Sequence, residues 1–550
     1  MQIPDVNLEA IPDLATRQLV GQLLNLIEAL AAENAALRIE LQQQRDDLAR
    51  LKGASPRPEI KPPVPPAATD HSSEAERQPP TPRGKPKQAK NATLTVTCER
   101  PYVVDPTALP RDATRSGTTE TIVQDLVLTP EVIRFVREVW FVPGTRQTIT
   151  APLPEGYHGG FGPHVRTFRL DPRPRLGQCQ PARFAELSDR CGAGYWCRYD
   201  CTLAGRPHGQ LARRGRGGEV HLAGLASGPW QATDQTSTRV DGRNEVCHVV
   251  GNDLFTSYHT RPGGTRQDVL AVLWDQEPFF RLNEDALAWL AETSCRPALQ
   301  FRLRAVLPWD CELTAAELHA RLLAAGIILT TQQHQQVCDA LAVAAYHAQT
   351  GMPIVRWLLS DDAAVYHWVT DEHGLCWVHD GRHYAKLSPV VLLHQQQLAD
   401  FRRAYWAFYR ELVTYRAAPS ASERERLAAA FDQLVARRTG YDDLDARIAK
   451  TAANRELLLA VLDYPALPLH NNAIELAARR RVQKRDVSFG PQSRAGAQAW
   501  DSFQTIAATA AKLGVRRYHY FRDRLMHPAT TPSLAELIRA RSGAAALNPS

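Results

Sequence analysis

Residues 467–485 read LPLHNNAIELAARRRVQKR, an apolar lead-in followed by an amide pair, one acid and a basic run. Asn472 is a favourable N-cap, because its side chain can accept a hydrogen bond from the first free amides of a helix. The stretch therefore predicts a helix with Glu475 at its third position, pointing along the first turn. One helix cannot bury all the basic residues, which favours phosphate contacts over core packing for Arg479, Arg480, Arg481, Lys484 and Arg485.

Two more acidic motifs precede this one. Residues 353–363, PIVRWLLSDDA, predict a buried strand that ends in acids. Asp361 and Asp362 would point to opposite faces of that strand, so only one of them can face a shared site. Residues 232–242, ATDQTSTRVDG, place Asp234 near the start of a strand pair. Each acid by itself is explained equally well as a cap or a surface charge, so spacing alone does not bring them together.

The chemistry that three such acids could perform is metal-dependent phosphoryl transfer. Without a covalent enzyme intermediate, that reaction uses two ions about 3.5–4 Å apart, which activate the attacking oxygen and stabilise the leaving one. Mg²⁺ prefers hard oxygen ligands and takes only a few carboxylates. Asp234, Asp361 and Glu475 are therefore the candidate catalytic residues and the candidate ligands of two Mg²⁺ or Mn²⁺ ions.

A dense run of motifs resembles the DDE transposases of insertion-sequence family sixty-six. The resemblance covers about residues 222–525, and more loosely 1–165. Asp234 stands in a D-x-T motif with Thr236, and Tyr366 follows the second acid at a spacing that favours Asp361 over Asp362. The remaining matches are Cys376-Trp377-Val378-His379, the basic pair Arg382 and His383, and Asn471-Asn472-x-x-Glu475 with Arg479 one turn later and Lys484-Arg485 beyond.

The resemblance implies an RNase H-like catalytic core, a mixed sheet with flanking helices and a helical insertion between the second Asp and the Glu. The two Asp would lie on adjacent strands and Glu475 on a facing helix. Water would cut a phosphodiester at the end of the element, and the freed 3′ hydroxyl would attack target DNA. The implied partners are double-stranded DNA, at element ends and target, and accessory proteins of the same element, with Arg382 among the DNA contacts.

Two other functions remain open at this point. The first is a nuclease-only or catalytically inactive relative of the same fold that still binds DNA. The second is a coiled-coil DNA-binding regulator in which the acids are incidental. Cys376 and His379 form half of a zinc site whose other half is not apparent, so a structural role is favoured for them, as for the Asn471-Asn472 pair.

Residues 14–52 form the clearest predicted helix. With Val20 at heptad position a, eight of ten seam positions are apolar over five heptads, which predicts a coiled coil. Asn34 falls at an a position, where Asn holds two parallel helices in register. A homodimer is the natural inference, and a helix packed within the same chain is the alternative.

Residues 167–219 are rich in Arg and Cys and contain no Val or Ile. Cysteine and histidine are the usual zinc ligands, and the segment offers Cys191, Cys197, Cys201 and His208. Their spacing matches no common zinc pattern. The favoured hypothesis is an out-of-frame translation that returns to sense near Val220.

The bulk properties fit a cytoplasmic, nucleoid-associated protein. The N-terminus lacks a signal peptide, no apolar run reaches eighteen residues, and the cysteines form no CxxC pair, so reduced thiols are expected. Residues 476–526 carry eleven Lys or Arg against three Asp, which suits a polyanionic partner.

The expected fold class is thus α/β, an RNase H-like core preceded by a coiled-coil helix and a small β-rich module. Strands are expected at CHVVGNDLFTSYHT (247–260) and DVLAVLW (268–274). The expected segments are a dimerisation helix (1–52), a Pro-rich basic linker (53–92), a β-rich module for DNA ends (93–166), the irregular segment (167–221), the first part of the core (222–389), a helical insertion (390–460), the last part of the core with the Glu helix (461–526) and a C-terminal tail (527–550).

Overall fold

The computed structural model describes residues 6–51, 99, 131, 133–155, 157, 162–164, 216–488, 490–527 and 530–547. The chain divides into two units, Gln78–Pro152 and the remainder, Met1–Arg77 with Leu153–Ser550. No helix among the described residues is long and apolar enough to cross a membrane.

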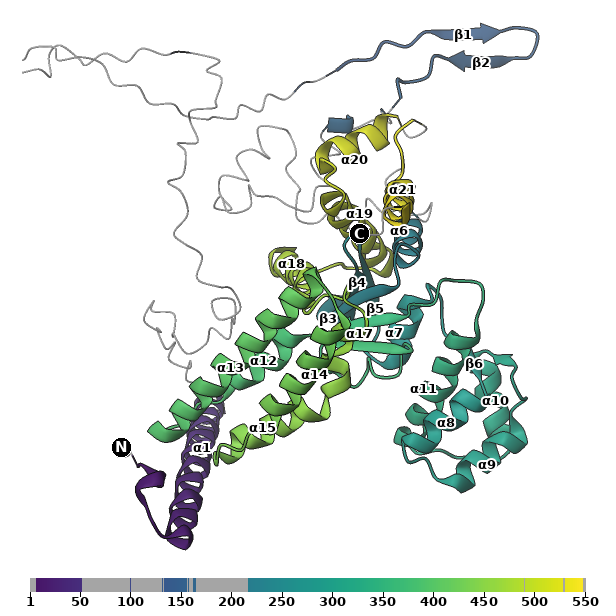
Figure 1. Cartoon of the computed structure of the whole chain (residues 1–550). Coiled ribbons are helices and arrows are strands. Elements are labelled where there is room, and N and C mark those ends of the chain that lie inside the picture. Colours follow the sequence, from purple (N-terminus) through teal and green to yellow (C-terminus); the bar gives the residue numbers. More distant parts are fainter. Residues whose placement is uncertain are drawn as a thin grey trace, which may run out of the picture. The chain divides into compact units, whose positions relative to one another are not determined.

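A five-stranded mixed sheet organises the larger unit (Figure 1). β3 pairs antiparallel with β4, and β4 antiparallel with β5, whereas β3 pairs parallel with β8, and β8 parallel with β9. Helices pack on this sheet, so the expected α/β class is confirmed. The strands are β3 (Trp230–Val240), β4 (Arg243–Gly251), β5 (Thr256–Arg261), β8 (Trp357–Ser360) and β9 (Glu372–Leu375).

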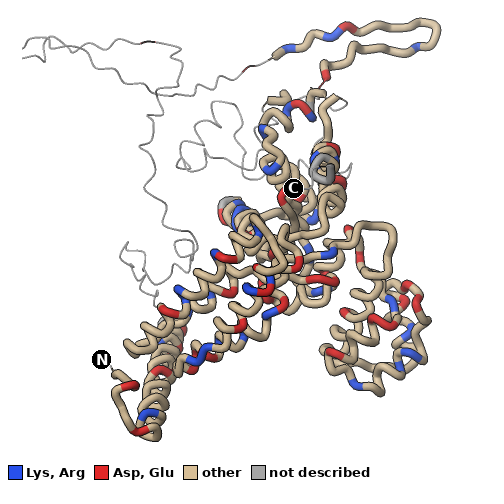
Figure 2. Tube along the Cα trace, viewed as in Figure 1, with Lys and Arg blue, Asp and Glu red and all other residues tan. Residues whose placement is uncertain are grey.

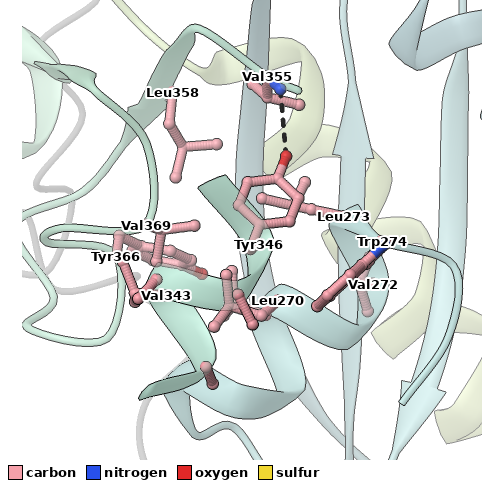
Figure 3. Packing of buried hydrophobic residues seen from close by; sticks show 14 of the residues in the cluster. Leu270, Val272, Leu273, Trp274, Val343, Tyr346, Val355, Leu358, Tyr366 and Val369 are labelled. Carbon is pink, nitrogen blue, oxygen red and sulfur yellow. Dashed lines mark hydrogen bonds between the residues drawn. The ribbon is translucent and has the colours of Figure 1, made fainter. Parts of the chain in front are cut away.

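Both faces of the sheet are buried. Successive strand residues point to opposite faces, and Trp357 and Leu359 share one hydrophobic cluster while Leu358 belongs to another. The first cluster includes Ile474 of α18 (Asn472–Ser488). The second, larger cluster is drawn in part in Figure 3, where the hydroxyl of Tyr346 of α11 (Thr331–Ala348) accepts a hydrogen bond from the backbone amide of Val355 at 3.1 Å.

Further helices complete the core. α19 (Arg494–Lys512) packs against β5 and α6 (Arg216–Leu225), and α6 packs against α21 (Leu534–Leu547). α20 (Arg517–Met526) contacts α19. Of these helices, α19 and α6 pack directly against β5, the strand at one edge of the sheet.

The prediction of a strand at residues 268–274 is wrong, because this segment lies in α7 (Arg266–Leu273). The helix begins at a capping box in which Thr265 and Asp268 each bond the other's backbone amide. All five residues from Val269 to Leu273 are buried. A short apolar run that is buried on every side lacks the hydrophobic periodicity that distinguishes a helix from a strand. The Thr-x-x-Asp capping signal before the run would have indicated a helix.

A block of helices that the sequence analysis did not single out lies between β5 and β8. It contains α8 (Glu284–Glu292), α9 (Pro297–Val306), α10 (Ala315–Ala324) and α11, with the short strands β6 (Phe280–Arg281) and β7 (Glu312–Leu313) paired antiparallel. α11 packs against α7 and α8, so the block shares the large cluster of the sheet.

Residues 390–460 are helical, as expected. α13 (Leu392–Ala417), α14 (Ala421–Val435) and α15 (Asp442–Ala453) pack with α12 (Trp377–Lys386) around their own aromatic core, and the short helices α16 (Arg455–Leu458) and α17 (Ala460–Asp463) lead back to the sheet. Ser420 caps α14 by accepting a hydrogen bond from the backbone of Glu423. The helical insertion thus has a core separate from the two clusters on the sheet.

The N-terminal helix α1 (Leu14–Leu51) follows a 3₁₀ turn (Leu8–Ala10). One side of α1 packs within the chain, since Leu24 is buried and Glu28 accepts hydrogen bonds from the backbone of Val390 and Val391. The seam leucines remain exposed, at 48–54% for Leu23, Leu30, Leu37, Leu41 and Leu48. The helix is therefore confirmed, and its dimerisation stays a prediction.

The smaller unit contains one described hairpin, β1 (Val139–Val142) with β2 (Gln147–Thr150). The remainder of the expected β-rich module falls mostly outside the described residues. Most of the segment 167–221 does too, including Cys191, Cys197, Cys201 and His208, and with them the zinc and reading-frame hypotheses.

Candidate active site

Asp234 and Asp361 lie at the same level of two adjacent parallel strands. Ala232 of β3 pairs with Leu359 of β8, and each acid follows its pairing residue by two positions. Because strand side chains alternate, both acids also share the face of Ala232 and Leu359, which is the face that packs against α18. Asp234 lies within β3 rather than near its start, and Asp361 comes directly after β8.

Asp362 turns away from this pair. One of its carboxylate oxygens accepts a hydrogen bond from the side chain of Asn454 at 3.1 Å, and the other lies 3.3 Å from Nε2 of His367. Asp362 is exposed, whereas Asp361 is half-buried. The geometry therefore favours Asp361 as the second acid, as the spacing to Tyr366 did.

Glu475 approaches the two Asp from the first turn of α18. The helix begins at Asn472 and the carbonyl of Asn471 accepts the first hydrogen bonds, from Ile474 and Glu475. The prediction of Asn472 as the N-cap is thus wrong by one residue, and Glu475 is the fourth helical residue rather than the third. The side-chain amide of Asn471 is 3.3 Å from the carbonyl of Thr233, so this residue ties the start of α18 to β3 next to Asp234.

The three carboxylates are close enough for each charge to affect the others. Burial raises the pKa of Asp234 from 3.8 to about 7, and the charges of Glu475 and Asp361 add to the effect. The Gln235 amide, which donates to Asp234 at 2.8 Å, only partly offsets the rise. Burial beside Asp234 and Asp361 also raises the pKa of Tyr366 well above 10, so its hydroxyl stays protonated next to the acids.

Glu475 is held by two residues of α12. Arg382 donates to Oε2 at 2.9 Å, and Nε2 of His379 lies 3.4 Å from Oε1, which has no hydrogen-bond partner. One nitrogen of the Arg382 guanidinium is thus engaged with the acid, and its expected contact with DNA stays a prediction. Cys376 is the N-cap residue of α12, and burial raises the pKa of its thiol to about 11.

A buried network fixes α12, and no motif in the sequence marks it. Asp380 accepts hydrogen bonds from Tyr405 and Thr451, each at 3.0 Å, and forms an ion pair with Arg447. Gly381 lies so close to Trp406 that an added Cβ would come within 2.4 Å of its ring. These contacts with α13 and α15 set the position of His379 and Arg382. Asp380 directly follows the Cys-Trp-x-His motif, but its partners are distant in sequence.

The basic run colours part of α18 blue in Figure 2. Its members divide into exposed and buried residues. Arg479 and Arg480 are exposed and Lys484 is half-buried. Arg485 is also half-buried, and it donates to the carbonyl of Ser237 at 2.6 Å.

The prediction of a phosphate contact is wrong for Arg481, which is fully buried. Its guanidinium forms an ion pair with Asp501 at 2.9 Å, donates to Gln504 and Thr260, and stacks on Trp500. Position 481 points from α18 toward α19 and β5, and this burial is not visible in a run of three consecutive arginines. Arg481 joins these three elements instead of contacting a ligand.

The donor set suits hard divalent ions. Three carboxylates converge on one face of the sheet, and burial with mutual repulsion leaves Asp234 short of compensating positive charge. Among the described residues, Oε1 of Glu475 is a buried oxygen without a hydrogen bond. Oxygen ligands of this kind, few in number and shared with water and phosphate, are those that Mg²⁺ and Mn²⁺ accept.

Comparison with known proteins identifies the family. The model of the IS66 transposase family matches residues 343–499, which include Asp361, the Cys-Trp-x-His motif and Glu475. An uncharacterised protein of Sinorhizobium fredii, y4jO, is 31% identical over 326 residues, which are 58% of this chain and 99% of that protein. No solved structure matches the chain. The chain belongs to the IS66 family of transposases.

Proposed function

We propose that this chain cuts DNA at the ends of its own insertion sequence and joins those ends to target DNA, with Asp234, Asp361 and Glu475 as ligands of two Mg²⁺ or Mn²⁺ ions. The observation that carries the proposal is the convergence of the three carboxylates on one face of the sheet. The order β5-β4-β3-β8-β9, with only β4 reversed, supports an RNase H-like core.

The chain's own residues would position both the metal ligands and the DNA. Bound divalent ions supply a Lewis acid that activates the attacking oxygen and stabilises the leaving one. Asp234 gives up its proton when positive charge arrives, and Arg382 and His379 hold Glu475 in orientation. Arg479 and Arg480 face solvent on the helix that carries Glu475, so they can hold the phosphate backbone near the acids.

The test is cleavage by the full chain of DNA that carries the gene with its natural flanks. Asp234→Asn, Asp361→Asn and Glu475→Gln should each abolish cleavage and joining while DNA binding is retained. Asp362→Asn is the matched control, because this acid is adjacent in sequence but faces Asn454 and His367, and it should retain activity. Cleavage that survives the loss of any of the three acids would refute the proposal.

The joining step separates transposition from a nuclease of the same fold. A nuclease would cut without regard to the flanks and would not link the new 3′ end to a second DNA. A DNA-binding relative without activity would bind and cut nothing. The proposed partners of the active complex, a second copy through α1 and accessory proteins of the same element, are tested by adding them to the joining reaction.

A further inference from the structure

Cys376, His379 and Glu475 bring three different types of metal ligand together beside the acids. One ligand atom of each lies within 4.8 Å of the other two. The sequence shows only the Cys-x-x-His half of a site, and α18 supplies the third ligand from far along the chain. A tetrahedral zinc ion holds its sulfur and nitrogen ligands roughly 3.5 Å apart, so side-chain shifts of about 1 Å would close this site.

The sulfur of Cys376 is buried at the start of α12. Burial raises the pKa of its thiol to about 11, and the nearby backbone amides of Asn471, His379 and Val378 offset only part of that rise, so a metal ion must displace the thiol proton to bind. Cys376 is fully buried, while the side chain of His379 is 23% exposed and offers a path from solvent.

Glu475 belongs to this group and to the acidic trio at once. The oxygen that faces His379, Oε1, is the one without a hydrogen bond. Mg²⁺ does not favour thiolate or imidazole ligands, whereas Zn²⁺ readily takes sulfur, nitrogen and carboxylate oxygen together. The ion that is present therefore decides which set of ligands Glu475 joins.

We infer that Cys376, His379 and Glu475 form an inhibitory site for Zn²⁺ or a similar borderline divalent ion, whose occupation withdraws Glu475 from the catalytic ions. The inhibitory effect rests on the proposed function of Glu475, whereas the binding site does not. The predicted consequence is that Zn²⁺ inhibits DNA cleavage supported by Mg²⁺.

Binding is tested with Co²⁺ on the full chain, in a background where Cys191, Cys197 and Cys201 are Ser. A thiolate-to-cobalt charge-transfer band at one equivalent is expected. Cys376→Ser should remove the band, and Cys311→Ser should keep it, because Cys311 is exposed and is not one of the three candidate ligands. Substitution of a residue that only supports a metal ligand typically weakens metal affinity by roughly 10–100-fold. Loss of the Cys376 thiolate, a ligand itself, should therefore weaken Co²⁺ affinity by at least about 100-fold. A band that survives Cys376→Ser, or no band at all, would overturn the site.

Two further measurements keep the outcome clear. The second variant, His379→Ala, alters a partly exposed side chain and should weaken Co²⁺ binding. It remains informative even if circular dichroism shows that Cys376→Ser does not fold. Co²⁺ binding by His379→Ala that equals that of the unaltered chain would overturn the site. In Mg²⁺-supported cleavage, Zn²⁺ should inhibit Cys376→Ser only at concentrations at least about tenfold above those for the unaltered chain. Equal inhibition would refute the competition. If no variant cleaves DNA, the proposed function fails, and the cobalt result still decides the site.

Discussion

At the scale of single residues, Asp234 links metal binding to stability. Its pKa rises from 3.8 to about 7 in the folded chain, so folding takes up a proton between these values. The contribution of Asp234 to the free energy of unfolding without metal should therefore fall as pH rises from about 4 to 7 and stay level above, and it is read as the difference between the unaltered chain and Asp234→Asn. Asp234→Asn removes the penalty and should be more stable than the unaltered chain at pH 8, but not at pH 4. Urea unfolding with a chelator measures this, and equal stability at pH 8 would contradict it.

The same protonation predicts how metal affinity depends on pH. A divalent ion must displace the proton of Asp234, so affinity for Mn²⁺ should rise as pH increases from 6 to 8. Asp234→Asn should bind more weakly and show little of this dependence. Titration calorimetry in buffers of different ionisation enthalpy reports the proton released, and a pH-independent affinity in the unaltered chain would contradict the assignment.

Neighbouring arginines on α18 should have opposite effects. Arg481→Met leaves Asp501 buried without its partner and should cost about 3–5 kcal/mol of stability. Arg480→Met should leave stability unchanged, weaken DNA binding and lower the slope of log affinity against log salt by about 1. Urea unfolding and salt-dependent DNA binding distinguish the two. A stable Arg481→Met, or an Arg480→Met with normal DNA affinity, would contradict the division of the basic run.

At the scale of elements, the position of α12 depends on Asp380. Asp380→Ala removes the acceptor of Tyr405 and Thr451 and leaves Arg447 without its partner, which should cost about 3–5 kcal/mol. The matched control is Asp400→Ala, which breaks an exposed ion pair with Arg403 on α13 and should change stability little. Thermal unfolding compares them, and equal effects would show that the buried network does not fix the helix.

The sequence predicted the elements that carry the three acids, which are a strand pair at Asp234, a strand before Asp361 and a helix at Glu475, and it failed where no such motif marks the chain. Asp234, Asp361 and Glu475 were found because motif residues mark them, and parallel pairing of β3 with β8 then explains why they meet. A strand was predicted at residues 268–274, where the chain forms α7, because a fully buried run has no visible periodicity. Arg481 was misjudged because burial depends on α19 and β5, which approach from elsewhere in the chain. The helices between β5 and β8 carry none of the family motifs, although capping boxes at Thr314 and Thr330 mark the starts of α10 and α11.

At the scale of the whole molecule, α1 predicts that the chain pairs with a second copy. The contacts of α1 within the chain use Leu24 and Glu28, which are outside the heptad seam, and the seam leucines stay about half exposed. Analytical ultracentrifugation of the full chain should show a dimer, and Leu30→Glu with Leu37→Glu should shift it to monomer. A monomer before substitution would contradict the prediction.

The central claim is that the acids of the trio bind the ions that cut DNA, and a change of metal preference tests it most directly. Cys in place of a metal-binding Asp disfavours Mg²⁺ but still accepts Mn²⁺, which tolerates softer ligands. Cleavage by Asp234→Cys and Asp361→Cys should therefore be lost with Mg²⁺ and recovered in part with Mn²⁺, whereas Asp362→Cys should cut with either ion. Full activity of Asp234→Cys or Asp361→Cys with Mg²⁺ would contradict the account.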